Sequence, residues 1–172
     1  MTATSSSPPF NAESNIESDT LADDTKPSTD TDQIIHQLRR KEGNWVTWGR
    51  SCQALQKAKM SAQEIYEATG FEPIQQNQLI VASQVFASME AGGVSDATKA
   101  HYQTRGSDSL YEFRILSQDT RAAAADFAFH HGLDSEQVKE IVKALRDFYY
   151  SETPPPGFEK TMGDAAAYYY WR

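Results

Sequence analysis

Two segments of the chain carry the same helix-start signature, and it constrains the fold more than any other feature. In Ser61–Glu64 and in Asp134–Gln137, a short polar residue is followed three positions later by Glu or Gln, which is the spacing of a capping box. Apolar residues flank each box at the two positions of a hydrophobic staple: Met60 with Ile65, and Leu133 with Val138. Each signature therefore predicts where a helix begins and which side of it faces the core.

The rest of the chain from Thr31 onward also reads as consecutive helices. Thr31 or Asp32 can cap a first helix that Gly43 ends, and Asn44 can cap a second, with Trp45 and Leu55 on its apolar face. Apolar residues recur at helical spacing throughout, and no strand alternation is bounded by turns. The sequence predicts an all-α fold, a compact helical bundle that contains a helix-turn-helix at residues 44–70.

Composition divides the chain into three parts. Residues 1–30 are rich in Ser, Thr, Asp and Pro, and we expect a disordered acidic tail there. Residues 31–151 are the expected helical domain. Residues 152–172 start with the Pro-rich linker Pro154–Gly157 and end in Ala165–Trp171, which we interpret as the start of a following helix. The aromatic end suggests an N-terminal part of a longer protein.

Charge and apolar content limit the partners. Of the net charge of −8, the tail carries −5, so the helical part is nearly neutral and has no basic field to attract nucleic acid. No run of about 18 apolar residues exists, so no membrane span is expected. One cysteine, Cys52, and the lack of a targeting signal favour the cytoplasm.

The residues that enzymes and metal sites need are not grouped in the sequence. His130 and His131 are adjacent, so on a helix they point about 100° apart. Cys52 lies on an apolar face, where a small buried hydrophobe is the ordinary reading. The glycines have neither phosphate-loop nor dinucleotide spacing. We therefore expect no enzyme activity, no cofactor and no metal site.

Residues 44–70 also raise the alternative of a helix-turn-helix regulator that binds nucleic acid. In that motif the second helix reads base edges and needs neighbours that attract phosphate. Here the second helix carries Glu64 and Glu67 and no base, which argues against recognition of DNA. The same arrangement also serves for packing or for binding a protein.

Two long blocks resemble the Rubisco accumulation factor family of assembly chaperones from cyanobacteria and chloroplasts. They are "RRKEGNWVTWGRSCQALQKAKMSAQEIYEATGFEPIQQNQLIVASQVF" at residues 39–86 and "YEFRILSQDTRAAAADFAFHHGLD" at residues 111–134. The resemblance implies an N-terminal α-domain, a flexible linker and a C-terminal β-domain that makes the whole protein a homodimer. Since no β-domain follows residue 172 here, we expect this chain alone to be a monomer. The acidic tail favours a cyanobacterial member, in the cytosol or associated with carboxysomes.

By the same resemblance, the function is that of an ATP-independent chaperone. It binds and stabilises dimers of the Rubisco large subunit and promotes assembly of the octameric core. Arginine and aromatic side chains are favoured anchors on protein-binding surfaces, although the basic run at 39–41 can equally be a solvated patch. The candidates for contact with the large subunit, chosen on chemistry, are Arg39, Arg40, Lys41, Arg50, Tyr111 and Arg114.

The helix-start signatures predict a ranking of stabilities. Because Ile65 and Val138 complete staples and reach the core, we expect truncation of either to Ala to lower the free energy of unfolding by about 2 kcal/mol. Ser61→Ala removes only a cap and should cost about 1 kcal/mol. Denaturant melts measure the three changes. A loss for Ser61→Ala as large as that for Ile65→Ala would mean that the helix start is misplaced.

Overall fold

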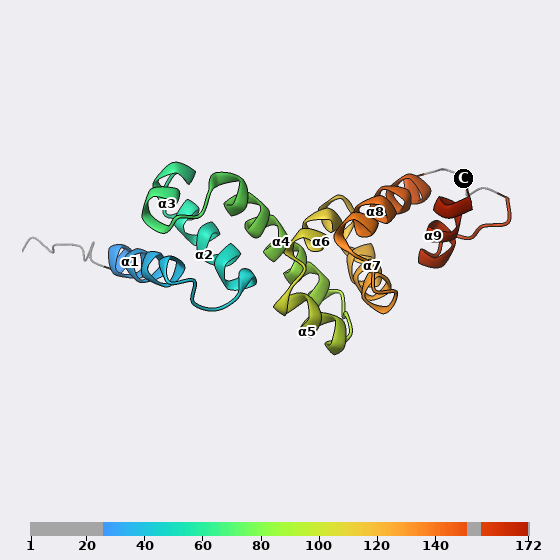
Figure 1. Ribbon diagram of the computed structural model, residues 1–172, viewed down its shortest axis with the longest axis horizontal. Coiled ribbons are helices and arrows are strands. Elements are labelled where there is room, and N and C mark those ends of the chain that lie inside the picture. The colour runs from blue at the N-terminus through green and yellow to red at the C-terminus, as the bar shows by residue number, and fades with distance from the viewer. Residues whose placement is uncertain (1–25, 151–155, 172) are drawn as a thin grey trace, which may run out of the picture.

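The computed structural model describes residues 26–150 and 156–171, and every regular element in these ranges is helical (Figure 1). The elements are α1 (Lys26–Arg39), α2 (Trp45–Lys57), α3 (Ala62–Thr69), α4 (Pro73–Ala91), α5 (Asp96–Thr104), α6 (Ser107–Glu112), the 3-10 helix η1 (Phe113–Ile115), α7 (Gln118–His130), α8 (Ser135–Tyr150) and α9 (Met162–Trp171). The all-α class and the helix-turn-helix are confirmed. No helix in the described part combines the length and the apolar character that a membrane span needs.

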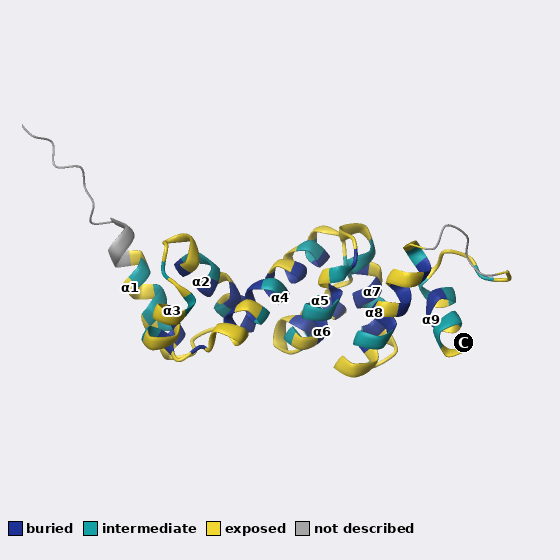
Figure 2. Cartoon of the chain, turned by 90° about the horizontal axis from the view of Figure 1, so that it is seen from above, coloured by how far each residue is buried: buried dark blue, intermediate teal, exposed yellow. Residues whose placement is uncertain are grey.

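The helices are arranged along one long axis, with α4 near the middle (Figure 1). α1, α2 and α3 lie on one side of α4, and α6, α7 and α8 lie on the other, with α9 beyond α8. One continuous cluster of buried apolar side chains runs from Leu38 in α1 to Ala165 in α9. Figure 2 shows this buried interior as a dark band along the axis, with exposed residues at the loops and outer faces.

Both helix-start signatures form the bonds that their spacing predicts. Ser61 N donates to Glu64 Oε2 at 2.7 Å, and Glu64 N donates back to Ser61 Oγ at 3.2 Å. At the start of α8, Asp134 N donates to Gln137 Oε1 at 3.0 Å, and Gln137 N donates to Asp134 Oδ1 at 2.8 Å. Ile65 and Val138 are buried in the core. The two predicted capping boxes are therefore confirmed.

The start of α1 corrects the expected boundary of the tail. Residues 1–25, which make up most of the expected disordered tail, lie outside the described residues. α1 begins at Lys26, so the cap expected at Thr31 or Asp32 is wrong, and residues 26–30 are helical. Pro27 explains the difference, because proline lacks only an N–H that the first turn of a helix leaves unpaired. The polar composition of residues 26–30 had favoured a tail over a helix.

The aromatic end of the chain forms α9, which packs against α8. Ala165 and Ala166 are buried, and the ring of Tyr168 lies 5.7 Å from that of Phe148. Tyr169 donates its hydroxyl to Glu140 Oε2 at 3.2 Å. Most of the expected Pro-rich linker, including Pro154, lies outside the described residues. The segment interpreted as the start of a helix is a helix, and it docks on the helical domain.

Buried polar groups hold the helix-turn-helix to its neighbours. Gln76 of α4 is fully buried, and its Nε2 donates to the carbonyl oxygens of Ala62 at 2.9 Å and Phe71 at 2.6 Å. Trp45 of α2 donates its indole N–H to the carbonyl oxygen of Tyr102 in α5 at 2.9 Å. These bonds satisfy buried donors, and they fix the turn between α3 and α4 and the approach of α5 to α2.

Two helices of the core approach each other closely at Gly49 of α2. A methyl group at this position would overlap the carbonyl oxygen of Leu79 and would lie 2.9 Å from Ser83 Cβ, both in α4. Gly49 is therefore the residue that lets the backbones of α2 and α4 come together. A larger residue has to push the helices apart, because backbone atoms cannot move aside as a flexible side chain can.

Gly49→Ala should lower the free energy of unfolding by about 2 kcal/mol, because the clash with α4 exceeds the gain in helix propensity. Gly163→Ala is the matched control, since Gly163 also lies in a helix and its added methyl group meets open space. We expect the control to be neutral or to stabilise by up to about 1 kcal/mol. Urea melts compare the two variants, and equal effects would contradict the close α2–α4 contact.

Candidate protein-binding surfaces

Arg39, the last residue of α1, is bound within the chain. Its Nε and Nη2 donate to the carbonyl oxygen of Ala68 at 2.9 and 2.8 Å, near the end of α3. A guanidinium group that neutralises an unpaired helix-end carbonyl stabilises that end. Arg39 therefore joins α1 to α3 and has fewer donors left for a partner than its neighbours in the sequence.

Three other basic candidates are exposed around α1 and α2. Arg40 lies 3.1 Å from Glu42, and its side chain is 65% exposed. Lys41 is exposed and has a φ of 52°. Arg50 of α2 is 59% exposed and reaches Glu90 of α4 only at 3.8 Å, while Lys99 contacts the same carboxylate at 2.8 Å. Surface pairs of this kind hold a side chain weakly, so these cations stay accessible.

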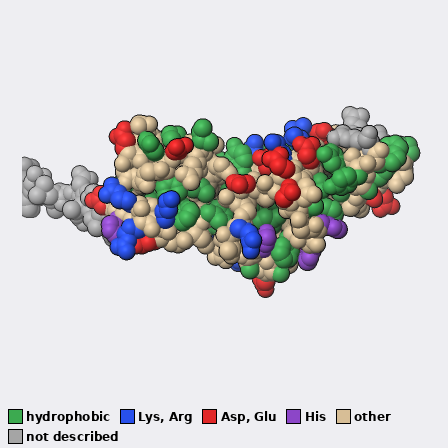
Figure 3. All heavy atoms as spheres, in the orientation of Figure 1, with side chains coloured by type: hydrophobic (Ala, Val, Ile, Leu, Met, Phe, Trp, Pro, Cys, Tyr) green, Lys and Arg blue, Asp and Glu red, His purple; other side chains and the backbone are tan. Residues whose placement is uncertain are grey.

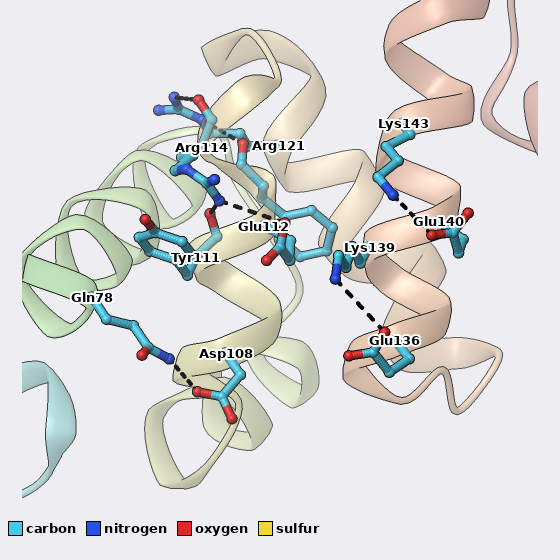
Figure 4. A network of polar contacts seen from close by, with 11 residues as sticks. Gln78, Asp108, Tyr111, Glu112, Arg114, Arg121, Glu136, Lys139, Glu140 and Lys143 are labelled. Carbon is cyan, nitrogen blue, oxygen red and sulfur yellow. Dashed lines mark hydrogen bonds and ion pairs between the residues drawn. The ribbon is translucent and has the colours of Figure 1, made fainter. Parts of the chain in front are cut away.

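The remaining candidates, Tyr111 and Arg114, form one unit on α6 and η1 (Figure 4). The guanidinium carbon of Arg114 lies 3.8 Å from the centre of the Tyr111 ring, and Nη1 donates to the Tyr111 carbonyl oxygen at 2.8 Å. Glu112 lies 3.5 Å from the same nitrogen. A cation held over an aromatic face keeps its charge at the surface in a defined position. The geometry of this pair is thus fixed without a partner.

Arg121 of α7 supports the segment that carries Arg114, and the sequence analysis did not identify it. Its guanidinium donates to the carbonyl oxygens of Phe113 and Arg114 at 3.3 and 3.1 Å, and to Ser88 Oγ of α4 at 3.2 Å. It thereby fixes η1, which carries Arg114, against α4 (Figure 4). The sequence could have indicated this role, because Arg121 lies three and four residues before Ala124 and Ala125. It therefore shares a helix face with two buried residues.

The candidates fall into two groups that the fold keeps apart. One group lies around α1 and α2, and the other lies on α6 and η1, with α4 between α2 and α6 (Figure 1). Figure 3 shows Lys and Arg atoms over the region of α1 and α2, and Lys, Arg, Asp and Glu atoms together over the region of α6 and α8. The helices that carry both groups pack on one core, with α4 between them, so α4 sets how far apart the groups lie.

The exposed side of α3 bears on the nucleic-acid alternative. Gln63, Glu64, Tyr66 and Glu67 are exposed on it, and Tyr66 is 41% exposed. The Glu64 carboxylate accepts from Ser61, and those hydrogen bonds hold its pKa below the usual value. The side of α3 that would face DNA is therefore negatively charged, which repels phosphate.

The side chains that could supply chemistry are dispersed or buried. Among the described residues, no three of His, Cys, Asp and Glu gather as a metal site would require. Cys52 is fully buried, and burial raises the pKa of its thiol to about 11. A thiol in this environment stays protonated and is a poor nucleophile. The candidate residues at the surface are charged or aromatic side chains, which suit contact with a protein.

Comparison with known proteins assigns the family. The model of the Rubisco accumulation factor 1 helix turn helix domain matches residues 30–90, and that of the Rubisco accumulation factor 1 alpha helical domain matches residues 102–172. The chain belongs to the Rubisco accumulation factor 1 family. The resemblance recognised in the sequence is thus confirmed, and the family's helix-turn-helix domain contains α2, α3 and α4.

Relatives in the family come from cyanobacteria and plants. The chain is 51% identical to RuBisCO accumulation factor 1 of Nostoc sp. over 140 residues, which are 81% of this chain and 39% of the relative. It is 43% identical to RuBisCO accumulation factor 1 of Synechocystis sp. over 86% of this chain and 41% of the relative. It is 32% identical to the chloroplastic Rubisco accumulation factor 1.1 of Arabidopsis thaliana over 70% of this chain and 28% of the relative. The chain spans about two fifths of the length of these cyanobacterial relatives.

The geometry around Arg121 predicts which arginine of this chain supports the fold. Arg121→Ala removes a donor from two carbonyl oxygens and a hydroxyl, although the Phe113 carbonyl oxygen keeps its bond from Leu116 N, and it should lower the free energy of unfolding by about 2 kcal/mol. Arg114→Ala, the control, removes an exposed side chain and should cost less than about 1 kcal/mol. Thermal or urea melts decide the ranking, and a larger cost for Arg114→Ala would contradict it.

Proposed function

We propose that this chain is the part of an ATP-independent Rubisco assembly chaperone that binds large-subunit dimers. In this role it stabilises the dimers and promotes assembly of the octameric core, in the cyanobacterial cytosol or in association with carboxysomes. The observation that carries the proposal is the match of both Rubisco accumulation factor 1 domain models to this chain. The names of the relatives supply the link to Rubisco.

The helical architecture suits reversible binding. A continuous apolar core joins every helix, so the surface groups keep fixed positions when a partner arrives. The candidate contacts are charged or aromatic side chains on separate helices, each able to add a modest share of affinity. A chaperone must release its client, and several modest contacts can be displaced one after another by a competing subunit.

Arg114 and Tyr111 are the strongest candidates for anchoring a large subunit. Their stacked arrangement restricts the guanidinium before binding, so less conformational freedom is lost when it meets a carboxylate. Arg50 is a second candidate, since it is exposed and held only by a long contact to Glu90. Arg39 is the least suited, because two of its donors are bound to Ala68.

The test is a titration of large-subunit oligomers, free of small subunits, with this chain and with the same chain fused to a dimerising coiled coil. We expect the single chain to bind weakly and the dimeric fusion to bind about a hundredfold more tightly, because the second copy binds at high effective concentration. Arg114→Glu should weaken binding by about tenfold or more. Arg105→Glu is the matched control, since Arg105 is exposed at the end of α5 and outside both candidate groups.

Each outcome bears on a separate part of the proposal. If neither the single chain nor the fusion binds, the chaperone assignment is wrong. If the single chain binds as tightly as the fusion, the assignment stands and the avidity argument is wrong. If Arg114→Glu and Arg105→Glu weaken binding equally, Arg114 is not an anchor. Circular dichroism of each variant shows whether the helices are intact.

The alternative of a nucleic-acid-binding regulator is tested in parallel by gel shift. The carboxylates on the exposed side of α3 argue against it. A shift of duplex DNA at physiological salt that the large subunit does not compete for would favour the regulator over the chaperone.

A further inference from the structure

Charge is divided unevenly along the first half of the chain. Residues 39–59 contain six bases and one acid, and residues 60–90 contain four acids and no base. The first segment forms the end of α1 and all of α2, and the second forms α3 and α4. These helices pack together, so a segment rich in bases and a segment rich in acids belong to one folded unit. Figure 3 shows Lys and Arg atoms over the region of α1 and α2.

The basic side chains of α2 are aligned on one face of the helix. Arg50 and Lys57 are seven residues apart, which is close to two full helical turns, so both project from the same side. Both are exposed, and Lys41 and Lys59 are exposed before and after the helix. We call Arg40, Lys41, Arg50, Lys57 and Lys59 the α2 basic face.

The backbone at Lys41 and Lys59 is unusual. They are the only described residues other than glycine with positive φ, at 52° and 71°, and six glycines hold the remaining left-handed positions. A side chain with a Cβ is strained in this region, and glycine is the residue of low cost there. The chain thus carries lysine at two left-handed positions near α2, where glycine, as at Gly43, would be easier to accommodate. Strain kept at a surface position motivates a functional hypothesis for the side chain.

The α2 basic face is only partly neutralised from within the molecule, since Arg40 lies 3.1 Å from Glu42. Within the described ranges, no ion pair involves Lys41, Lys57 or Lys59. Arg50 is 3.8 Å from a Glu90 carboxylate that Lys99 already contacts at 2.8 Å. Of the four acids of residues 60–90, all of them described, only Glu90 has an ion pair with this face, so the charges of the three lysines face solvent.

We propose that the α2 basic face docks on an acidic patch of a protein partner. Charge complementarity fits such a patch better than it fits nucleic acid. Residues 30–90 as a whole have a net charge of −1, so they have no net attraction for a long polyanion. A small acidic patch on a protein can contact the α2 basic face alone. In taking the Rubisco large subunit as that partner, the inference rests on the proposed function.

The test exchanges strained lysine for unstrained glycine. In the double variant Lys41→Gly, Lys59→Gly, melting temperature should stay the same or rise, because glycine adopts positive φ without strain. Affinity for large-subunit oligomers should fall by about tenfold, and its dependence on salt should become weaker. The matched control is Arg105→Gln, Arg146→Gln, which removes two exposed positive charges elsewhere and should leave both affinity and salt dependence unchanged.

The outcomes separate a binding role from a structural one. A lower melting temperature with unchanged affinity would show that the lysines only stabilise helix ends through the helix dipole, and would overturn the inference. Equal losses of affinity in the double variant and the control would also overturn it, because net charge alone would then explain binding. Gel shift of duplex DNA that the double variant abolishes would reassign the face to nucleic acid. If the unmodified chain does not bind large subunit at all, it is the proposed function that fails.

Discussion

At Gly49 the backbones of α2 and α4 approach so closely that no side chain fits between them. This contact orients α2 on α4, and through α2 it positions α1 and the basic residues at its end. α4 in turn packs against α6 and α7. The position of Tyr111 and Arg114 relative to the basic residues of α2 therefore depends on a helix pair that a single methyl group would separate.

The sequence predicted the features whose partners are near in the chain. Both capping boxes, the Asn44 cap and the left-handed Gly70 involve groups at most four residues apart, so spacing alone identifies them. Burial of Ile65 and Val138 followed from the same signatures. The start of α1 was wrong because a polar segment with Pro27 looks like a tail when read by composition, although proline suits the first turn of a helix.

The surface was less predictable, because exposure and pairing depend on contacts between distant segments. Arg39 and Arg40 are adjacent and look alike in the sequence, yet Arg39 is bound to a carbonyl oxygen 29 residues away, while Arg40 is mostly exposed. Asp126 shows the same limit, because it accepts from Ser95 Oγ 31 residues before it and so joins α7 to the start of α5. The positive φ of Lys41 and Lys59 is likewise set by where the chain must turn, and residue type does not indicate it.

The 19-residue helix α4 belongs to the region of the first family model, and it packs against α6 and α7, which belong to the region of the second. α2 and α6 contact the same stretch of α4, since Gly49 meets Leu79 and Gln78 donates to Asp108. An α-helix is a rigid spacer, so surfaces held on either side of it keep one separation. Two surfaces fixed to such a spacer contact a partner together only when the partner's own sites have the matching separation. A partner whose sites have a different separation contacts one surface at a time and binds with the affinity of that surface alone. The rigidity of one helix thus sorts assemblies by their geometry, in addition to any sorting by the chemistry of the contacts.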